Sequence, residues 1–320
     1  MNDNSPTAVA FYGADAQRSV IDLAALIDWI DAAHRRSAPD TTDSLIGPAE
    51  SQLFVRSAVL AGEAMGAKVV SICPGNPQLG LPSVQALFVL LDGRTGMPRA
   101  VLDATSLTYW RTAADSALGA RYLARKDART LLMVGAGGIA PWLIRAHRCA
   151  RPGLVDVLIW NRTASRAEQL AETLAREGIP AKAVGDLGAA VQRADIISAA
   201  TMTRAPLIRG EWLKAGAHLD LVGAYEAGTR EADDACVRRA RFFTDFRHSA
   251  KDVGDFLLPV ASGAMQEADL LGDLYDLVRG APGRLAGTDI TLFKNAGGGH
   301  LDLMTAQFLL DRLAPASATA

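Results

Sequence analysis

A glycine turn between two apolar runs constrains the fold of this 320-residue chain more than any other feature. An apolar run leads into residues 135–140 (GAGGIA), a helical stretch follows, and a second apolar run begins at Val155. Gly135 permits a tight turn, Gly137 lets the backbone approach a pyrophosphate, and Ala140 keeps helix and strand close. The free N–H groups and dipole of the helix N-terminus then favour phosphate. This strand, turn, helix and strand therefore predict a dinucleotide site.

The end of the second apolar run indicates which dinucleotide binds. NAD sites usually carry an acid about 20 residues after the turn, which bonds the ribose 2′-hydroxyl. Here Asn161, Arg162 and Thr163 follow the run, and Arg166 comes one helical turn later. Because Asn161 is neutral and the two arginines can hold a 2′-phosphate, the sequence favours NADP(H), with NAD(H) possible. The alternative is that both arginines are ordinary solvated charges at a helix start.

Further cofactor contacts are expected around the glycine turn and at the ends of later strands. Thr201 follows an apolar run, and ligands of Rossmann-type sheets lie beyond the carboxyl ends of the strands. The additional cofactor contacts that we predict are Gly138, Ile139, Ala200, Thr201, Met202 and Thr112.

Composition excludes several classes of protein. The net charge of −2 provides no basic footprint for nucleic acid. Three widely spaced cysteines suggest no disulfide framework, so we expect a reducing, cytoplasmic location. The first residues lack the apolar segment of a signal peptide, and no apolar stretch reaches the ~18 residues that span a bilayer. We expect no membrane partner, and we assign no candidate residue to a metal.

The pattern of strands and helices changes near residue 125. Beyond it, predicted strands alternate with helices, which indicates a parallel sheet covered on both faces. Those strands are 131–134, 155–160, 181–184, 195–201, 218–224 and 241–245. Before it, a helix at 20–35 precedes short strands joined by turns, which predict a mostly antiparallel sheet. The short strands lie near 52–57, 68–72, 85–92 and 99–103.

We therefore predict an α/β protein with two domains. Residues 1–124 form an α+β substrate-binding domain, and residues 125–295 form a Rossmann NAD(P)-binding domain. A helix at 296–313 returns to the first domain, and 314–320 form a flexible tail.

Several strings along the chain carry a more specific resemblance. They are 66–70 (GAKVV), 74–77 (PGNP), 91–98 (LDGRTGMP), 107–114 (LTYWRTAA), 134–140 (VGAGGIA), 160–162 (WNR), 230–233 (READ) and 290–294 (ITLFK). In this order they resemble the ornithine cyclodeaminase/μ-crystallin family. The resemblance implies NAD(P)(H) on a Rossmann domain, a homodimer formed through the first domain, and chemistry on the imine of an α-amino acid. Family reactions include cyclodeamination, ketimine reduction and amino-acid dehydrogenation.

The same resemblance assigns two catalytic candidates. Lys68 stands where the family has its active-site lysine, and an ammonium tuned by burial can act as general acid or base. Arg111 stands where the family binds the substrate carboxylate, a task that suits a bidentate guanidinium. We expect both to face the nicotinamide of the bound cofactor. The alternatives are a surface lysine at a strand start and a helix-opening arginine.

Three departures from the family pattern bear on the substrate. Tyr225 stands where cyclodeaminases carry an aspartate, which argues against ornithine and is more similar to the Δ1-pyrroline-2-carboxylate reductase branch. Tyr225 is thus a candidate substrate contact, although plain packing is also compatible. The family's Pro-x-Arg arginine is missing, and Arg56 either replaces it as a substrate ligand or is structural. The string after Lys294 also departs from the family pattern; His300 there can reach the nicotinamide side, but capping of the helix start is favoured.

Three functions are compatible with these residues. We favour an NAD(P)H-dependent reductase of a cyclic imino acid, Δ1-pyrroline-2-carboxylate, which yields L-proline. The second is ornithine cyclodeaminase, which converts L-ornithine to L-proline plus ammonia. The third is a non-catalytic, μ-crystallin-like NADP-binding protein.

Overall fold

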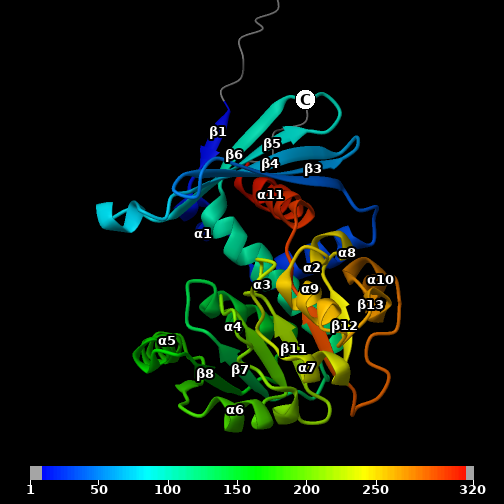
Figure 1. Ribbon diagram of the computed structural model, residues 1–320. Coiled ribbons are helices and arrows are strands. Elements are labelled where there is room, and N and C mark those ends of the chain that lie inside the picture. Colours follow the sequence, from blue (N-terminus) through cyan, green and yellow to red (C-terminus); the bar gives the residue numbers. More distant parts are fainter. Residues whose placement is uncertain (1–8, 315–320) are drawn as a thin grey trace, which may run out of the picture. The chain divides into compact units, whose positions relative to one another are not determined.

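The computed structural model describes residues 9–314, which form two compact units (Figure 1). Within that range, unit 1 comprises 9–22, 36–111 and 298–314, and unit 2 comprises 23–35 and 112–297. The chain thus passes between units inside a helix, at Arg111, rather than near residue 125, where the sequence pattern changes. The first long helix also belongs to unit 2. Of the predicted tail at 314–320, all residues after Ala314 lie outside the described residues.

Unit 1 is built on a six-stranded sheet in the order β1-β6-β5-β4-β3-β2. All neighbouring strands are antiparallel except β1 and β6, which are parallel. The elements are β1 (Ala10–Tyr12), α1 (Ala14–Val20), β2 (Asp40–Ile46), β3 (Gln52–Leu60), β4 (Ala64–Ile72), the 3-10 helix η1 (Asn76–Leu79), β5 (Val84–Asp92), β6 (Pro98–Asp103), the first turns of α3 (Ala104–Leu123) and α11 (Gly299–Leu313).

Helix α11 packs against β2 to β5 along one face of this sheet (Figure 1). Side chains alternate along a strand, so even-numbered residues of β3, β4 and β5 face α11 and odd-numbered ones face away. Gly66 on the inner face is required sterically, because an added Cβ would lie 2.6 Å from the ring of Phe88. The predicted antiparallel sheet and the returning C-terminal helix are both present.

Unit 2 contains an eight-stranded sheet in the order β13-β12-β14-β11-β10-β7-β8-β9, parallel throughout. Its strands are β7 (Thr130–Val134), β8 (Asp156–Trp160), β9 (Ala181–Ala183), β10 (Ile196–Ala199), β11 (His218–Leu221), β12 (Ala240–Thr244), β13 (Leu270–Gly272) and β14 (Ile290–Lys294). Counted from β7, the first five strands have the order 3-2-1-4-5 of a Rossmann fold, with its switch point between β7 and β10.

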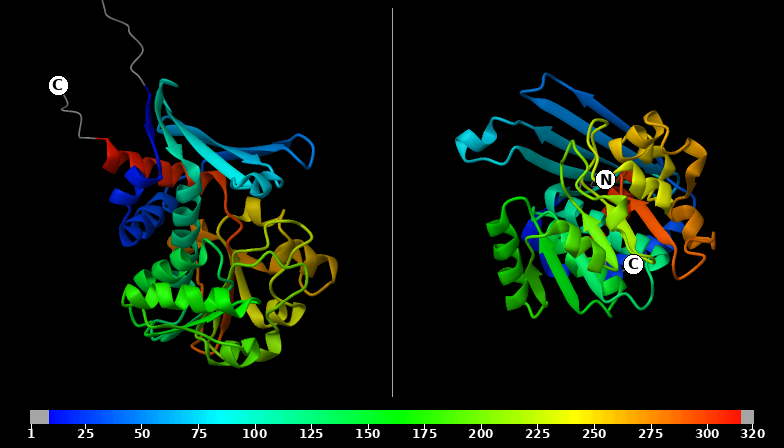
Figure 2. Two further views of the ribbon diagram at one scale, coloured as in Figure 1. Left: turned by 90° about the vertical axis from the view of Figure 1, so that its left-hand side faces the viewer. Right: turned by 60° about the horizontal axis from the view of Figure 1, so that its bottom comes forward.

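Helices flank this sheet (Figure 2). They are α2 (Leu23–His34), the rest of α3, α4 (Ala140–Ala150), α5 (Ala164–Arg176), α6 (Leu187–Arg193), α7 (Asp234–Arg239), α8 (Arg247–Ala250), α9 (Gly254–Ala261), α10 (Leu274–Val278) and the 3-10 helices η2 (Gly210–Trp212) and η3 (Glu267–Asp269). The predicted α/β class is confirmed. No helix of the described residues is both long and apolar enough to cross a bilayer.

A buried carboxylate ties the centre of unit 2 together. Asp220 of β11 accepts hydrogen bonds from Ser116 Oγ at 2.8 Å and Ser198 Oγ at 2.6 Å, and His147 Nε2 lies 3.1 Å away. All four side chains are buried. Burial raises the pKa of Asp220, but the hydrogen bonds from His147 and Ser198 outweigh it and hold that pKa below its usual value. The network fixes α3 and α4 on the strands that end at the candidate site.

Strand β13 offers a direct test of the apolar core of unit 2. Leu270 is 4% exposed and belongs to the core of unit 2, whereas its neighbour Leu271 is 46% exposed. We expect Leu270→Ala to lower the free energy of unfolding by about 2–5 kcal/mol through a lost core contact. Leu271→Ala should change it by less than about 1 kcal/mol. Urea unfolding of both variants measures the difference, and equal losses would contradict the assigned burial.

Candidate active site

The glycine turn after β7 has the backbone geometry that a phosphate cradle needs. Gly135 has φ +110°, and a Cβ there would lie 2.7 Å from the carbonyl oxygen of Ala200 at the end of β10. Its N–H donates to Trp160 O at 2.8 Å. A glycine at 135 therefore lets the ends of β7 and β10 approach closely at the switch point of the sheet.

Three successive backbone donors follow this turn. Among residues 9–314, the N–H groups of Gly137, Gly138 and Ile139 have no hydrogen-bond acceptor. An added Cβ at Gly137 would meet no atom within 4 Å, so its side of the turn is open. Helix α4 begins directly afterwards and has no side-chain N-cap. Unsatisfied donors at a helix N-terminus fit the pyrophosphate of a dinucleotide.

The end of β8 carries positive charge and no carboxylate. Asn161 accepts a hydrogen bond from Ala136 N–H at 3.2 Å and donates to Thr163 O at 2.9 Å, which fixes its side chain beside the glycine turn. Arg162 and Arg166 are exposed, and neither guanidinium forms an ion pair with another described residue. Both guanidinium groups are thus available to an anionic group of a ligand.

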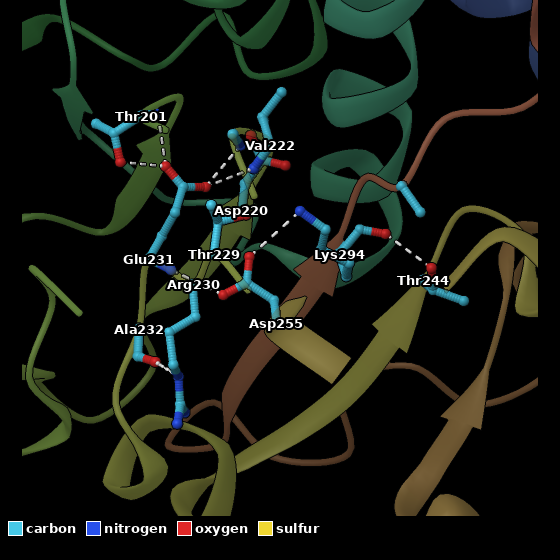
Figure 3. Close-up of polar contacts among 12 residues, drawn as sticks. Thr201, Asp220, Val222, Thr229, Arg230, Glu231, Ala232, Thr244, Asp255 and Lys294 are labelled. Carbon is cyan, nitrogen blue, oxygen red and sulfur yellow. Dashed lines mark hydrogen bonds and ion pairs between the residues drawn. The ribbon is translucent and has the colours of Figure 1, made fainter. Parts of the chain in front are cut away.

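Glu231 holds the ends of β10 and β11 together (Figure 3). Its Oε1 accepts from the Thr201 N–H at 2.6 Å and Thr201 Oγ1 at 2.7 Å. Its Oε2 accepts from the N–H groups of Val222 at 3.0 Å and Gly223 at 2.7 Å. A Cβ on Gly223 would lie 1.8 Å from Thr201 O, so the two segments touch. One carboxylate therefore fixes both segments through four donors.

Two further buried charges support Glu231. Asp255 accepts from the Glu231 N–H at 2.9 Å and pairs with Lys294 Nζ at 3.2 Å (Figure 3). Glu231, Asp255 and Lys294 are 1%, 2% and 0% exposed. Burial, and next the charge of Asp255, raise the pKa of Glu231 to about 7, while Lys294 and the Thr201 donors oppose that rise. Lys294 thus compensates for two neighbouring carboxylates. The family strings contain Glu231 and Lys294, but the sequence gave no reason for their role.

The remaining predicted contacts of unit 2 lie on the same strand ends or on α3. Tyr225 is 59% exposed, and its hydroxyl donates to the Met202 sulfur at 3.4 Å, which brings the loops after β11 and β10 side by side. Thr112 is buried in α3, and its carbonyl accepts from Asn295 Nδ2 at 2.9 Å. Contact of these residues with a ligand stays a prediction.

Unit 1 gathers a second cluster of buried charges. Lys68 Nζ lies 2.9 and 3.1 Å from the two carboxylate oxygens of Asp302 on α11, and 3.4 Å from Thr108 Oγ1. Arg111 Nε lies 3.2 Å from Asp302 Oδ1, but it is not aligned for a hydrogen bond and has no other acceptor among the described residues. Lys68, Arg111 and Asp302 are 4%, 7% and 0% exposed. A buried donor without an acceptor fits a further anionic group.

The surroundings of Lys68 bring its pKa close to neutral pH. Burial is the largest influence, and with the cations Arg111 and Arg56 it lowers the pKa of Lys68 to about 8, although Asp302 opposes the fall. Burial also raises the pKa of Asp302, but Lys68 and Arg111 outweigh it and hold that pKa below its usual value. The lysine can therefore exchange a proton near neutral pH.

Asp302 was missed by the sequence reasoning. Its helix was interpreted as a packing element, and the available signal was a lone acid inside a helix that is buried nearly all round. His300 is also buried in the first turn of α11, where Gly298 is the N-cap, so the favoured capping role is wrong.

Arg56 lies next to this cluster but is engaged by another carboxylate. Its Nε lies 3.0 Å from both oxygens of Asp43, and its Nη2 lies 2.6 Å from Oδ2. Among the described residues, no group of His, Cys, Asp and Glu side chains is arranged to hold a metal ion.

Comparison with known proteins agrees with this description. The sequence model of the ornithine cyclodeaminase/mu-crystallin family matches residues 21–317, which confirms the resemblance found in the strings. The Delta(1)-pyrroline-2-carboxylate reductase of Paracoccus denitrificans (strain Pd 1222) is 44% identical over 298 residues, 90% of this chain and 94% of that protein.

Solved structures match over nearly the whole chain. The Thermococcus litoralis Delta(1)-pyrroline-2-carboxylate reductase, in complex with NADH and L-proline, has a TM-score of 0.89 and 28% identity, covering 95% of this chain and 97% of that one. An archaeal alanine dehydrogenase dimer with bound NAD has a TM-score of 0.88 and 26% identity, covering 95% of each chain.

The Glu231 network predicts a defined effect on cofactor binding. In Glu231→Gln, one acceptor oxygen becomes an amide that faces backbone donors, so the ends of β10 and β11 should separate. We expect NADPH and NADH to bind about tenfold more weakly, which corresponds to the loss of one charge-assisted hydrogen bond. Calorimetric titration measures both affinities. Glu211→Gln, at an exposed glutamate of η2, is the matched control, and an equal response of the two variants would contradict the role.

Proposed function

We propose that this chain, which belongs to the ornithine cyclodeaminase/mu-crystallin family, is an NAD(P)H-dependent reductase of cyclic imino acids that converts Δ1-pyrroline-2-carboxylate to L-proline. The observation that carries the proposal is the buried cluster of Lys68, Arg111 and Asp302. Two cations share one carboxylate there, which leaves a positive charge for a substrate carboxylate. The names of a close relative and of a matching structure with NADH and L-proline support the same chemistry.

The proposed reaction divides the work between the cofactor and this chain. When bound, NAD(P)H supplies a hydride to the carbon of the C=N bond. Arg111 holds the substrate carboxylate through its guanidinium. Lys68 gives the balancing proton to the imine nitrogen, directly or through a water molecule, and Asp302 keeps Lys68 oriented and raises its pKa.

The two alternatives fit less well. Ornithine brings an additional ammonium group to a cluster that is already cationic, and Tyr225 stands where cyclodeaminases carry an aspartate. A purely binding protein has no need of a buried lysine whose pKa lies near 8. We also propose a cytoplasmic location, because Cys73, Cys149 and Cys236 are far apart in the sequence and odd in number, which suggests no disulfide framework.

The reductase proposal is tested through Lys68. We expect Lys68→Met to lower kcat by at least about 10²-fold, since the proton donor is lost. Cofactor affinity should stay within about twofold, because the glycine turn lies in unit 2. The assay follows NADPH absorbance with Δ1-pyrroline-2-carboxylate, and cofactor titration shows whether the variant is folded. Ammonia release from ornithine by the parent protein, without net use of cofactor, would instead support cyclodeamination.

The pH profile gives an independent check of the lysine. Because the acid form is required, kcat/KM should fall as pH rises through about 8. Asp302→Asn removes the carboxylate that raises the pKa of Lys68, so this decline should begin about one pH unit lower. The control is Asp311→Asn, at an exposed position of the same helix. An unchanged profile in Asp302→Asn would remove Lys68 as the titrating group.

We further propose that NADPH is preferred over NADH. The proposal is supported by exposed Arg162 and Arg166 and by the neutral Asn161 at the end of β8. Arg162→Ala should weaken NADPH about tenfold or more but NADH by less than about twofold, since only NADPH carries the 2′-phosphate. Arg176→Ala, at an exposed arginine of α5, is the control. Equal losses for both cofactors would exclude the proposed contact.

We also propose a homodimer formed through unit 1. The sheet face turned away from α11 exposes apolar side chains that include Leu53, Val59 and Leu87, at 38%, 40% and 45%. Light scattering should give about twice the chain mass of 33.8 kDa. The double change Leu53→Asp and Leu87→Asp should give the monomer, whereas Leu285→Asp, at an exposed leucine of unit 2, should not. A monomeric parent at micromolar concentration would refute the dimer.

A further inference from the structure

We propose that Asp43 restricts this protein to imino acids with a single carboxylate, by holding the Arg56 guanidinium in an ion pair beside the Lys68 cluster. The inference rests on the proposed function and adds the class of substrate. Asp43 then acts as a specificity-determining residue, since it decides whether Arg56 is available to a ligand.

The pair is built into the sheet. Asp43 on β2 and Arg56 on β3 are direct cross-strand partners, so their side chains leave the same face. Three N···O distances of 2.6 to 3.0 Å join the guanidinium to both carboxylate oxygens. A planar guanidinium matched to a carboxylate in this way is a strong, directional pair. A ligand carboxylate must displace Asp43 to use that edge of Arg56.

Arg56 is also a neighbour of the substrate cluster. It lies opposite Lys68 in the register of β3 and β4, on the face that α11 covers. Its positive charge lowers the pKa values of both Lys68 and Asp302. A Cβ on Gly299 would lie 3.3 Å from Arg56 Cγ, so the stem of the arginine packs at the start of α11. The guanidinium is thus close enough to influence a ligand that Lys68 and Arg111 hold.

The charges of these five side chains select a monoanion. Arg56 and Asp43 cancel, while Lys68 and Arg111 against Asp302 leave two positive charges minus one negative charge, or +1. One substrate carboxylate neutralises that charge. A second carboxylate would bring an uncompensated negative charge to a buried cluster, which is unfavourable unless it finds its own cation.

Replacing Asp43 should therefore broaden the substrate range. The Asp43 side chain is 43% exposed and that of Arg56 is 15% exposed, so Asp43→Asn removes an accessible negative charge from beside a largely buried guanidinium. A second carboxylate on the substrate can then take that place.

Two open-chain imines that differ by one carboxylate test the idea. Pyruvate and oxaloacetate each condense with ammonia, with loss of water, to imines that accept one hydride and one proton to give alanine and aspartate. The parent protein should favour the pyruvate imine. In Asp43→Asn, we expect the ratio of kcat/KM for the oxaloacetate imine over the pyruvate imine to rise about tenfold or more. Adding Arg56→Gln to Asp43→Asn should abolish the gain.

The matched control is Asp40→Asn. Asp40 lies on the same strand, but it pairs with Val59 on the opposite face of the sheet. The substitution Asp40→Asn therefore removes the same charge without changing a contact of Arg56. A ratio that is unchanged in Asp43→Asn, or that rises equally in Asp40→Asn, overturns the inference while the reductase activity stands. If the parent reduces neither open-chain imine nor Δ1-pyrroline-2-carboxylate, the proposed function itself fails, and the inference fails with it.

Discussion

The charge cluster of unit 1 depends on the ion pairs that the carboxylate of Asp302 forms with Lys68 and Arg111. Burial of an ammonium or a guanidinium is unfavourable by several kcal/mol for each ion, and Lys68 and Arg111 are both buried. One acid between them makes their burial tolerable, yet it neutralises only half of their charge. Burial first, and then the charges of Arg111 and Arg56, lower the pKa of Lys68, and the remaining positive charge is the basis of the proposed substrate site. The arrangement that permits the fold thus also prepares the chemistry.

Unit 2 uses buried acids in a different way. Asp220 and Glu231 each accept several donors, and in both cases the donors come from separate elements of the Rossmann sheet. Asp220 joins α3, α4 and β10 to β11, while Glu231 joins the segments that follow β10 and β11. Asp220 is bound by two hydroxyl groups and an imidazole, and Glu231 by a hydroxyl group and three backbone N–H groups, so both carboxylates fix the positions of neighbouring elements. The strand ends that a cofactor would contact are therefore set before any ligand arrives.

The sequence predicted the elements that are determined by a local residue pattern. Residues 131–162 predicted β7, the glycine turn, α4 and β8, and the positive φ of Gly135 follows from the tight turn there. It missed four strands. The residues of β2, DTTDSLI, are polar and mostly exposed, β1 and β13 have only three residues each, and β14 was noted only as a string of the family resemblance. Asp43, Glu231 and Asp302 could not be assigned, because their roles come from partners distant in sequence. No local spacing encodes the pairing of Lys68 with a residue 234 positions later.

Helix α11 completes unit 1 but follows unit 2 in the sequence, which has a consequence for biosynthesis. The ribosome makes β2 to β6 and Arg111 early, but Asp302, the counterion of Lys68 and Arg111, belongs to α11, which is translated after the whole of unit 2. Residues 112–297 emerge in between as one continuous segment, which carries the whole parallel sheet of unit 2. Domains generally fold as units during synthesis, so the parallel sheet can form while the first sheet still lacks one covering layer. Closure of such a long-range contact is slow, and it must follow synthesis of α11. Until α11 packs, the inner face of the antiparallel sheet leaves Val70, Phe88 and Leu90 uncovered, and Lys68 lacks its carboxylate partner.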